Sequence, residues 1–317
     1  MARRYRAAYR AGRDRALVAL LRGARSMLGA LGLERGLRLA DRVGALVPRI
    51  LPEVRELSLE HLALALPELG RDAHERLVRD MFRGHARSVI EIVRMADLAA
   101  RIDDVVSTEG VEILDEALAA GRGVIAVTGH IGNWELLAAY FGMHGYPVTV
   151  IATPVKGERL NAENIALRAQ FGVETVLRDG PGASRRILRT LKNGRILAIL
   201  MDQATRGQAV QVPFFGRPAW TPIGPALLAQ RTGARVIGAF IHRLPDGRHR
   251  ISIRRPELPA ATGGDVASRD AWVEAATASF TALIEQEIRR RPDEWVWWHR
   301  RWREMPKDRP RDAVVAA

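Results

Sequence analysis

Strand-like and helix-like segments alternate from about residue 111 onward, and this alternation constrains the fold more than any other feature of the sequence. The strand-like runs are short and apolar, as in GVIAVT (123–128), PVTVIA (147–152) and ILAILM (196–201). Strands that alternate with helices form α/β sheets with helices on their faces. We therefore expect an α/β fold with a central mixed, mostly parallel sheet flanked by helices. Further strands are expected at 235–242 and 249–255, and helices at 111–120, 134–143, 158–170, 182–192, 223–231 and 268–290.

The N-terminal 50 residues form a basic amphipathic segment. Apolar residues recur at helical spacing from Ala16 to about Val47, with arginines on the other side of the pattern. Such a segment suits an anionic membrane surface, although arginine-rich faces also occur on helices that are simply solvated. Two or three further helices are expected in 52–98. We predict a membrane-associated helix over 1–50, an α/β domain with a helical N-terminal part over 51–305, and a disordered tail over 306–317.

The composition narrows the kind of partner. The chain has 317 residues, with 49 Lys or Arg against 36 Asp or Glu, and its net charge of +13 implies an anionic partner such as nucleic acid, acidic lipid or an acidic protein. It has no cysteine, which excludes disulfides, thiolate catalysis and cysteine metal sites. The run Leu136 to Val155 lacks charged residues but contains glycine and proline, so we expect a buried helix and strand there, not a membrane span.

A histidine and a glutamate follow the first predicted strand. In VTGHIGNWELL, His130 lies in the loop after the strand, Asn133 is a good helix N-cap, and Glu135 falls in the first helical turn. A helix N-terminus favours an ionised carboxylate. Placed against His130, that carboxylate would fix the imidazole tautomer and raise its basicity, so that His130 takes a proton from an alcohol. The alternative is a capping glutamate beside a structural histidine.

A second polar pair, Asp202 and Gln203, follows the predicted strand 196–201. The carboxyl ends of parallel strands share one edge of a sheet, so both pairs are expected at one site. The serine elbow G-x-S-x-G, the zinc helix H-E-x-x-H and the phosphate loop G-x-x-x-x-G-K-[ST] are absent. We therefore expect no metal and no covalent acyl-enzyme, and favour a single displacement with His130 as the base.

Four blocks of sequence resemble the lipid A biosynthesis acyltransferases, the late lauroyl and myristoyl transferases of Gram-negative bacteria within the lysophospholipid and glycerol-phosphate acyltransferase superfamily. The resemblance extends to about Met305. It implies an α/β fold behind a membrane-associated N-terminal helix, peripheral or monotopic at the cytoplasmic face of the inner membrane. It also implies acyl transfer from an acyl carrier protein thioester to a hydroxyl of a lipid A precursor or related glycolipid. The blocks are GHIGNWEL, MDQ, VPFFGRPAWTPIGPALLAQRTGARVIGAF and RPDEWVWWHRRWRE.

The resemblance also assigns roles to residues. His130 matches the family's histidine base and Glu135 its acidic partner. Arg168 falls where the family has a substrate-region arginine, whereas Arg159 in the same predicted helix is expected to face solvent or a headgroup. Arg168 or a backbone amide near Gly129–Gly132 would stabilise the oxyanion. The residues expected to bind substrate are Asn133, Arg168, Asp202 and Gln203.

The implied partners are acyl carrier protein or acyl-CoA, an anionic glycolipid acceptor and a membrane surface. No cofactor is implied, since the acyl thioester is a co-substrate. The stretch 153–164 lacks the aromatic Tyr-Arg-Pro character common in the lipid A enzymes. Related bacterial enzymes acylate mannosylated phosphatidylinositols or other glycolipids with acyl-CoA, and such an acceptor is the first alternative.

Two alternatives come from other classes of function. A basic nucleic-acid-binding protein is compatible with the charge, but no zinc finger or RNP-type motif is present, so we expect no nucleic acid partner. A hydrolase would use water in place of the alcohol.

Two aromatic segments complete the predictions. The segment VPFFGRPAWTP is expected to be a proline-punctuated loop whose aromatics lie in the core, line an acyl pocket or touch the membrane. WVWWHRRW is expected to be an edge strand with buried tryptophans and outward-facing arginines. His242 and His299 are expected to be structural.

Overall fold

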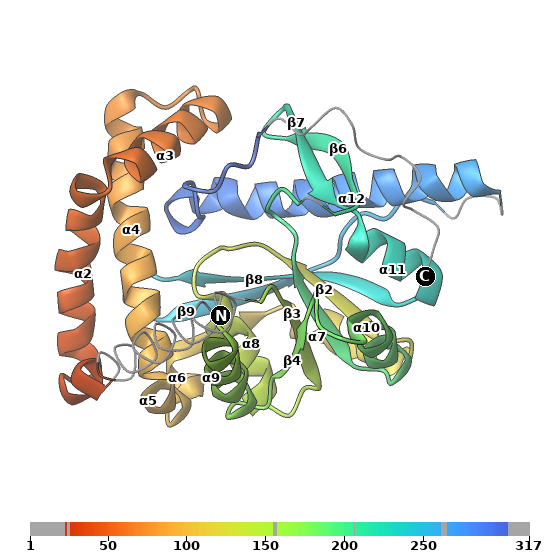
Figure 1. Ribbon diagram of the computed structural model, residues 1–317, viewed down its shortest axis with the longest axis horizontal. Coiled ribbons are helices and arrows are strands. Elements are labelled where there is room, and N and C mark those ends of the chain that lie inside the picture. The colour runs from red at the N-terminus through yellow and green to blue at the C-terminus, as the bar shows by residue number, and fades with distance from the viewer. Residues whose placement is uncertain (1–22, 24–25, 155–156, 206, 261–264, 304–317) are drawn as a thin grey trace, which may run out of the picture.

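A seven-stranded mixed sheet lies at the centre of the molecule (Figure 1). The computed structural model describes residues 23, 26–154, 157–205, 207–260 and 265–303. The strand order is β1-β9-β8-β2-β5-β3-β4, and every neighbouring pair is parallel except β8 and β9. The expected α/β class is therefore confirmed. The strands are β1 (Val106–Glu109), β2 (Val124–Thr128), β3 (Val148–Ala152), β4 (Glu174–Leu177), β5 (Ile196–Leu200), β8 (Arg235–Arg243) and β9 (His249–Arg254).

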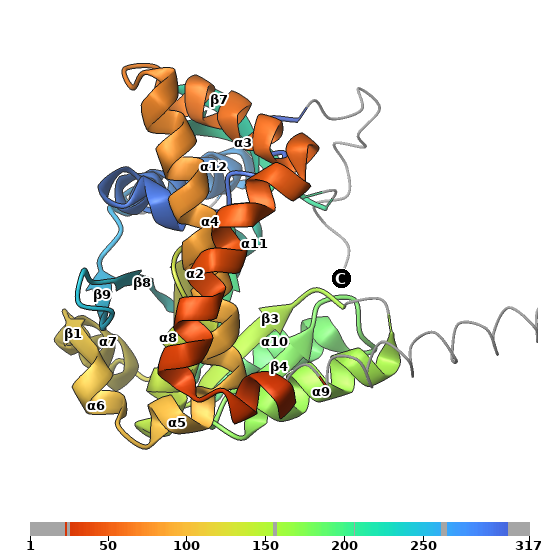
Figure 2. The same ribbon diagram turned by 90° about the vertical axis from the view of Figure 1, so that its left-hand side faces the viewer.

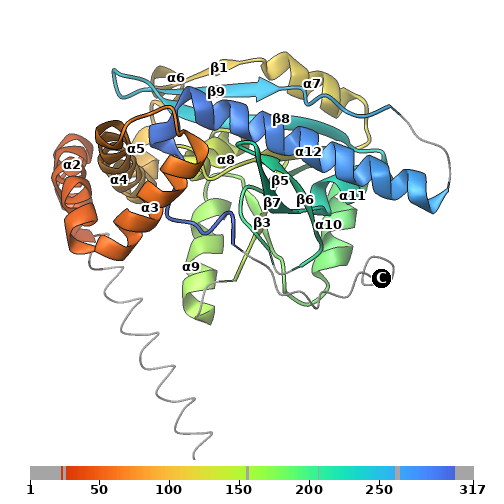
Figure 3. The same cartoon turned by 90° about the horizontal axis from the view of Figure 1, so that it is seen from above.

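The two faces of the sheet carry separate hydrophobic cores, because successive side chains of a strand point to opposite faces. In β2, Ile125 and Val127 belong to a core that includes residues of α11 and α12. Val124 and Ala126 belong to the other core, with residues of α7 and α8. Figure 1 shows α12 above the sheet and α8 below it, and Figure 3 shows α12 lying along β8. These helices are α7 (Val111–Ala119), α8 (Trp134–Met143), α11 (Gly224–Thr232) and α12 (Val266–Arg290).

Three helices stand at one end of the sheet, at the left of Figure 1 and nearest the viewer in Figure 2. α2 packs closely on α4, where a Cβ added to Gly44 would lie 2.7 Å from the Cα of Arg83. α4 reaches the residues that follow β2, and there Glu91 accepts a hydrogen bond from Asn133. The helices expected within 52–98 are thus confirmed. These three helices are α2 (Leu33–Ile50), α3 (Pro52–Ala65) and α4 (Arg71–Val93), and the short helices α5 (Met95–Ala99) and α6 (Ile102–Val105) follow them in the chain.

A contact between two glycines brings α8 against the end of α9 (Glu158–Ala169). A Cβ on Gly142 of α8 would lie 2.1 Å from the carbonyl oxygen of Phe171. Gly172 has a φ of 75°, which favours glycine, and a Cβ there would lie 2.7 Å from the Gly142 carbonyl oxygen. Since α8 carries Glu135 and α9 carries Arg168, this packing determines how closely the two side chains approach.

Two segments differ from the sequence prediction. VPFFGRPAWTP is part of a hairpin of β6 (Ala209–Phe214) and β7 (Arg217–Pro222), not a loop. The turn residues Phe215 and Gly216 have φ values of 53° and 70°, the left-handed region that suits a tight hairpin. Among the residues that the structure describes, β6 and β7 pair only with each other, so their prolines leave no ladder partner unbonded in the main sheet.

The C-terminal aromatic segment is not the expected edge strand. After the 3₁₀ turn η1 (Pro292–Glu294), it makes a single β-bridge, between Trp295 and Ile131. Trp295 and Trp297 are fully buried as expected, but Arg301 does not face outward. Arg301 is also fully buried, because its guanidinium donates to the Trp220 carbonyl at 2.6 Å and lies over the Phe214 ring.

The remaining secondary-structure predictions are mostly confirmed. All five predicted strands and all six predicted helices from 111 onward form, including α10 (Ala183–Lys192), whereas β1 and β4 were not predicted. The uncharged run from Leu136 folds as most of α8 followed by β3. Among the described residues, no helix has the length and apolarity needed to span a bilayer. The first 22 residues and the predicted tail over 306–317 lie outside the described residues.

Replacing Gly142 by alanine tests the glycine contact. We expect Gly142→Ala to lower the free energy of unfolding by about 1–3 kcal/mol, because the new methyl group meets backbone atoms that have no room to move aside. Gly84→Ala in α4 is the matched control, since a Cβ there has no neighbour within 4 Å and helix propensity favours alanine by about 1 kcal/mol. Urea unfolding of both variants provides the comparison, and equal stability of the two would contradict the packing argument.

Candidate functional site

The register of β2 and β5 brings His130 and Asp202 together. The two strands pair in parallel from Val124↔Ile196 to Thr128↔Leu200, an offset of 72 residues. His130 and Asp202 each lie two residues beyond these strands and keep the same offset. The backbone N–H of His130 donates to Asp202 Oδ2 at 2.8 Å, and His130 Nδ1 lies 2.8 Å from Asp202 Oδ1. The predicted meeting of the two polar pairs at one sheet edge is confirmed for these residues.

Asp202 is a buried carboxylate with three hydrogen-bond donors. Besides the two groups of His130, Trp295 Nε1 donates to Oδ2 at 2.7 Å. Burial alone raises the pKa of Asp202, but the charge and hydrogen bonds of His130, together with the bond from Trp295, outweigh burial and lower it to about 2. The carboxylate is therefore ionised at neutral pH.

His130 is held as an oriented base. Burial lowers its pKa, but the charge and hydrogen bond of Asp202 and the charge of Glu135 bring the pKa above its usual value. Because Asp202 accepts at Nδ1, the proton of the neutral ring lies on Nδ1, and Nε2 has no hydrogen-bond partner among the described residues. The His130 side chain is 23% exposed and contacts Trp134 edge to face, so Nε2 is available to a substrate.

The predicted partnership of His130 with Glu135 is wrong in its geometry. Glu135 instead binds Arg168 in a bidentate pair, with Nε to Oε2 at 2.9 Å and Nη2 to Oε1 at 2.6 Å. Arg168 of α9 reaches the first turn of α8, whereas the loop that carries His130 meets Asp202, which follows β5. Glu135 still acts on His130 through its charge. The carboxylate that contacts the imidazole is Asp202.

The other predicted substrate residues lie in different surroundings. Arg168 and Gln203 line the same cavity as His130 and Glu135, and Arg159 is exposed as expected. Asn133 does not line that cavity. It is 2% exposed, its Oδ1 accepts from the Leu136 N–H at 3.1 Å as the predicted N-cap of α8, and its Nδ2 donates to Glu91.

The donors expected for an oxyanion are partly occupied. The N–H groups of His130, Ile131 and Gly132 donate to Asp202, to the Gly129 carbonyl and to the Glu294 carbonyl, respectively. Arg168 uses Nε and Nη2 for Glu135. Its Nη1 has no hydrogen-bond partner in the part of the chain that the structure describes.

A cavity of about 580 Å³ opens at these residues and extends along the sheet. It lies on the face covered by α7 and α8, and its walls are mostly apolar. Alternation explains this lining: Ala126, Ala198 and Ala239 of three adjacent strands point to the cavity, while their neighbours point to the opposite core. Alanine is short, and a row of alanines on adjacent strands leaves space between sheet and helices. Leu137 and Phe141 of α8 form the facing wall.

The C-terminal segment contributes residues that the sequence did not predict for the site. Trp295 reaches Asp202, and Glu294 beside it accepts from His242 at 2.9 Å. His242 also bonds Glu287 at 3.0 Å. Burial lowers the pKa of His242, but its hydrogen bonds to the two carboxylates and their charges outweigh burial and raise the pKa to about 9. The imidazolium between the two carboxylates therefore holds this segment in place. The tryptophan-rich block WVWW indicated that Trp295 is buried, but nothing in the sequence indicated its contact with Asp202.

An imidazole oriented by a buried carboxylate thus lines an apolar cavity in an α/β sheet, and this combination suits an enzyme whose substrate has a hydrocarbon chain. No cluster of three or more potential metal ligands occurs among the described residues. The family model of the bacterial lipid A biosynthesis acyltransferases matches residues 13–304, and the chain belongs to this family.

Curated relatives fall into two groups by the substrate in their names. The phosphatidylinositol mannoside acyltransferase of Mycobacterium tuberculosis is 29% identical over 233 residues, which cover 73% of this chain and 68% of that protein. The lipid A biosynthesis palmitoleoyltransferase of Escherichia coli K12 is 24% identical over 274 residues, 84% of this chain and 85% of that protein. The lipid A biosynthesis lauroyltransferase of the same organism is 24% identical over 280 residues, which cover 86% of this chain and 87% of that protein. The chain is accordingly an O-acyltransferase.

Removing the charge of Asp202 tests the pair. Since Asp202 raises the pKa of His130, Asp202→Asn is expected to lower that pKa, so that the neutral imidazole persists to lower pH. The measurement is an NMR titration of the His130 ring. Asp103→Asn is the control, because Asp103 contacts the exposed His144 and not His130. An unchanged pKa of His130 in Asp202→Asn would show that the carboxylate does not control the base.

Proposed function

We propose that the protein transfers a fatty acyl chain from an acyl thioester, carried by acyl carrier protein or coenzyme A, to a hydroxyl of a lipid A precursor or related glycolipid, with His130 as the general base. The observation that carries this proposal is the His130–Asp202 pair at the opening of the apolar cavity. The free Nε2 of a histidine oriented in this way is the usual base for activating an alcohol.

The reaction follows from the geometry. His130 Nε2 takes the proton of the acceptor hydroxyl, whose oxygen forms a bond to the thioester carbonyl carbon. Asp202 stabilises the imidazolium that results, because its buried charge lies 2.8 Å from Nδ1. The carbonyl then re-forms as the carbon–sulfur bond breaks, and the departing thiolate takes the proton from His130. No covalent enzyme intermediate is required.

Arg168 and Glu135 support the developing charge in this proposal. The bidentate pair holds the guanidinium in one orientation, and Arg168 Nη1 remains free to donate to the oxyanion. A donor placed in this way contributes about 3–4 kcal/mol to transition-state stabilisation. Glu135 thus acts by orienting Arg168 and by its charge on His130, rather than by contacting the imidazole.

The apolar cavity is the proposed site for the acyl chain. Its size lies within the range of pockets that bury most of a ligand, and its walls offer the chain few polar partners. Gln203 lies at the polar end near His130, where the thioester and the acceptor would meet. The names of the relatives support a glycolipid acceptor, either lipid A or a phosphatidylinositol mannoside.

We also propose that α2 lies on a membrane surface, with the cytoplasmic face of the inner membrane as the expected location. Leu39, Val43, Leu46 and Ile50 recur at helical spacing and are 40%, 48%, 48% and 69% exposed. They form a stripe beside the exposed Arg35, Arg38, Arg42 and Arg49. An apolar stripe flanked by arginines matches the interface of a bilayer that contains anionic lipids.

Substitution of His130 tests the proposed function. His130→Ala is expected to lower the turnover of acyl transfer to a glycolipid by on the order of 10² or more, while the protein still folds and unfolds cooperatively. His144→Ala removes an exposed histidine of the same α8 region and is expected to leave turnover unchanged. The assay follows the acylated glycolipid by mass spectrometry with acyl carrier protein and coenzyme A thioesters in parallel. Near-normal transfer by His130→Ala would rule out this residue as the base, and release of free fatty acid alone would indicate a hydrolase.

Charged substitutions in the α2 stripe test membrane binding. Leu46→Glu/Ile50→Glu is expected to weaken binding to vesicles containing phosphatidylglycerol by about tenfold or more, because charges replace apolar contacts at the interface. Leu188→Glu/Leu258→Glu adds the same charge at exposed leucines outside α2 and is the control. Vesicle co-sedimentation gives both affinities. Equal losses in the two variants would attribute the effect to net charge alone.

A further inference from the structure

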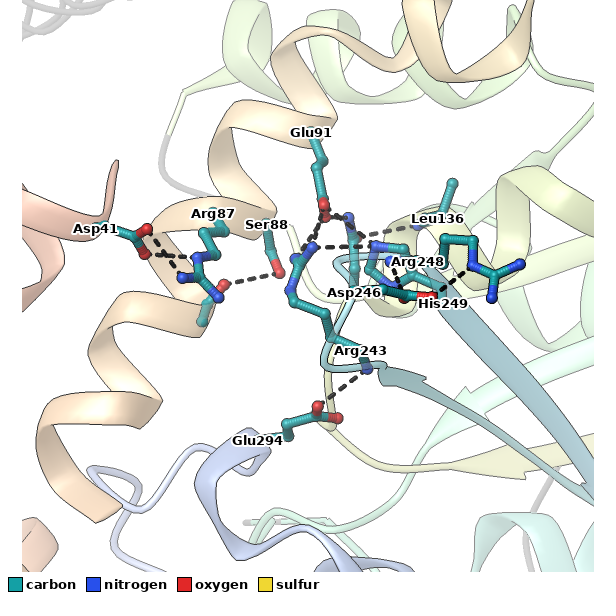
Figure 4. A network of polar contacts seen from close by, with 12 residues as sticks. Asp41, Arg87, Ser88, Glu91, Leu136, Arg243, Asp246, Arg248, His249 and Glu294 are labelled. Atoms are coloured by element: carbon teal, nitrogen blue, oxygen red, sulfur yellow. Dashed lines mark hydrogen bonds and ion pairs between the residues drawn. The ribbon is translucent and has the colours of Figure 1, made fainter. Parts of the chain in front are cut away.

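Glu91 of α4 is a buried carboxylate that connects three separate parts of the chain (Figure 4). Its side chain is 3% exposed. One oxygen, Oε1, accepts from Arg243 Nη1 and from His249 Nε2, which is 3.1 Å away. The other, Oε2, accepts from Arg243 Nη2 at 2.8 Å and from Asn133 Nδ2 at 2.9 Å. The ends of β8 and β9 and the start of α8 therefore meet at one charged group.

The contact with Asn133 is distinct from the other three. Arg243 is the last residue of β8 and His249 the first of β9, and neither lines the acyl cavity. Asn133 ends the loop 129–133 that carries His130, and it caps the helix that carries Glu135. The rest of this loop is fixed at His130 by Asp202 and at Gly132 by the Glu294 carbonyl. Glu91 supplies the fixed point at the end of the loop that enters α8.

A merely stabilising ion pair would not require this contact. The bidentate bond to Arg243 and the bond to His249 already compensate the buried charge of Glu91. Asn133 lies against a second, polar cavity of about 240 Å³ on the α4 side of the loop, so it does not contact a substrate in the acyl cavity. Its side-chain oxygen instead caps α8, and its side-chain nitrogen binds Glu91.

We propose that Glu91 is a positioning residue for acyl transfer: by holding Asn133 it sets the loop that carries His130 and the first turn of α8 that carries Glu135. This inference rests on the proposed function. A displacement of the order of 1 Å at a reacting group is enough to cost a catalyst up to about 10²-fold in rate. Loss of the Glu91–Asn133 bond therefore affects the rate constant of the chemical step more than the binding of either substrate.

The primary test is Asn133→Ser. Serine is as good an N-cap as asparagine, so α8 keeps its cap, and no charge changes, but the bond to Glu91 is lost. We expect kcat to fall between about tenfold and 10²-fold, with KM for the thioester and the glycolipid within about twofold of wild type. A raised KM with unchanged kcat would make Asn133 a substrate contact and overturn the proposal. Unchanged values of both would overturn it as well.

A second readout does not depend on transfer activity. If the loop moves, His130 moves away from Asp202, and the His130 pKa measured by NMR in Asn133→Ser falls below that of the wild type. Because Asn133→Ser changes no charge, such a fall reports displacement alone. If the wild-type protein transfers no acyl group, the proposed function fails. The positioning role of Glu91 is then tested by the pKa of His130 alone, and an equal pKa in Asn133→Ser and the wild type would overturn it.

Substitution of Glu91 itself requires a matched control. Glu91→Gln is expected to lower kcat by at least as much as Asn133→Ser. Glu75→Gln removes another carboxylate of α4 that also binds an arginine, Arg55, but it does not contact the loop 129–133, so kcat is expected to stay unchanged. In Glu91→Gln/Asn133→Asp, the carboxylate and amide exchange places, and the bond and the cap are both restored. A double variant no faster than Glu91→Gln would contradict the proposal.

Discussion

The buried charge of Asp202 is the constraint on which the rest of the site depends. An ionised carboxylate in a protein interior is costly unless hydrogen-bond donors surround it. Here three donors come from two places in the fold: the backbone and ring of His130 after β2, and the indole of Trp295 in the C-terminal segment. The sheet register, the loop and the C-terminal segment are therefore all arranged around one group, and the orientation of the histidine follows from it.

The outline of this arrangement was predictable from the sequence, and the pairing within it was not. Strand periodicity located His130 and Asp202 at the ends of two buried strands, and their family resemblance marked both. The short spacing between His130 and Glu135 suggested a local pair. The observed partner lies 72 residues away because β5 is the neighbour of β2, and strand order is a long-range property that local patterns do not encode. Arg168 was expected in the site, but not as the partner of Glu135.

Elements that were missed or misread share a physical cause. β4 is four residues long and β1 is mostly exposed, so neither shows a strong apolar pattern. The β6–β7 hairpin contains prolines that usually argue against strands, and its isolation from the main sheet makes them acceptable. Arg301 looked like a surface residue because arginine rarely lies in a core without a carboxylate. Its backbone and aromatic partners belong to the hairpin, which only the tertiary structure brings near.

The position of Trp295 has a consequence for the order in which the chain matures. A polypeptide emerges from the ribosome from its N-terminus, so β2, β5 and the His130–Asp202 pair are complete while the third donor to Asp202 is still unsynthesised. Until Trp295 has been synthesised, its indole N–H is missing from the donors around Asp202. The order of synthesis therefore places the strands of the site before the segment that completes the hydrogen bonding of its buried carboxylate.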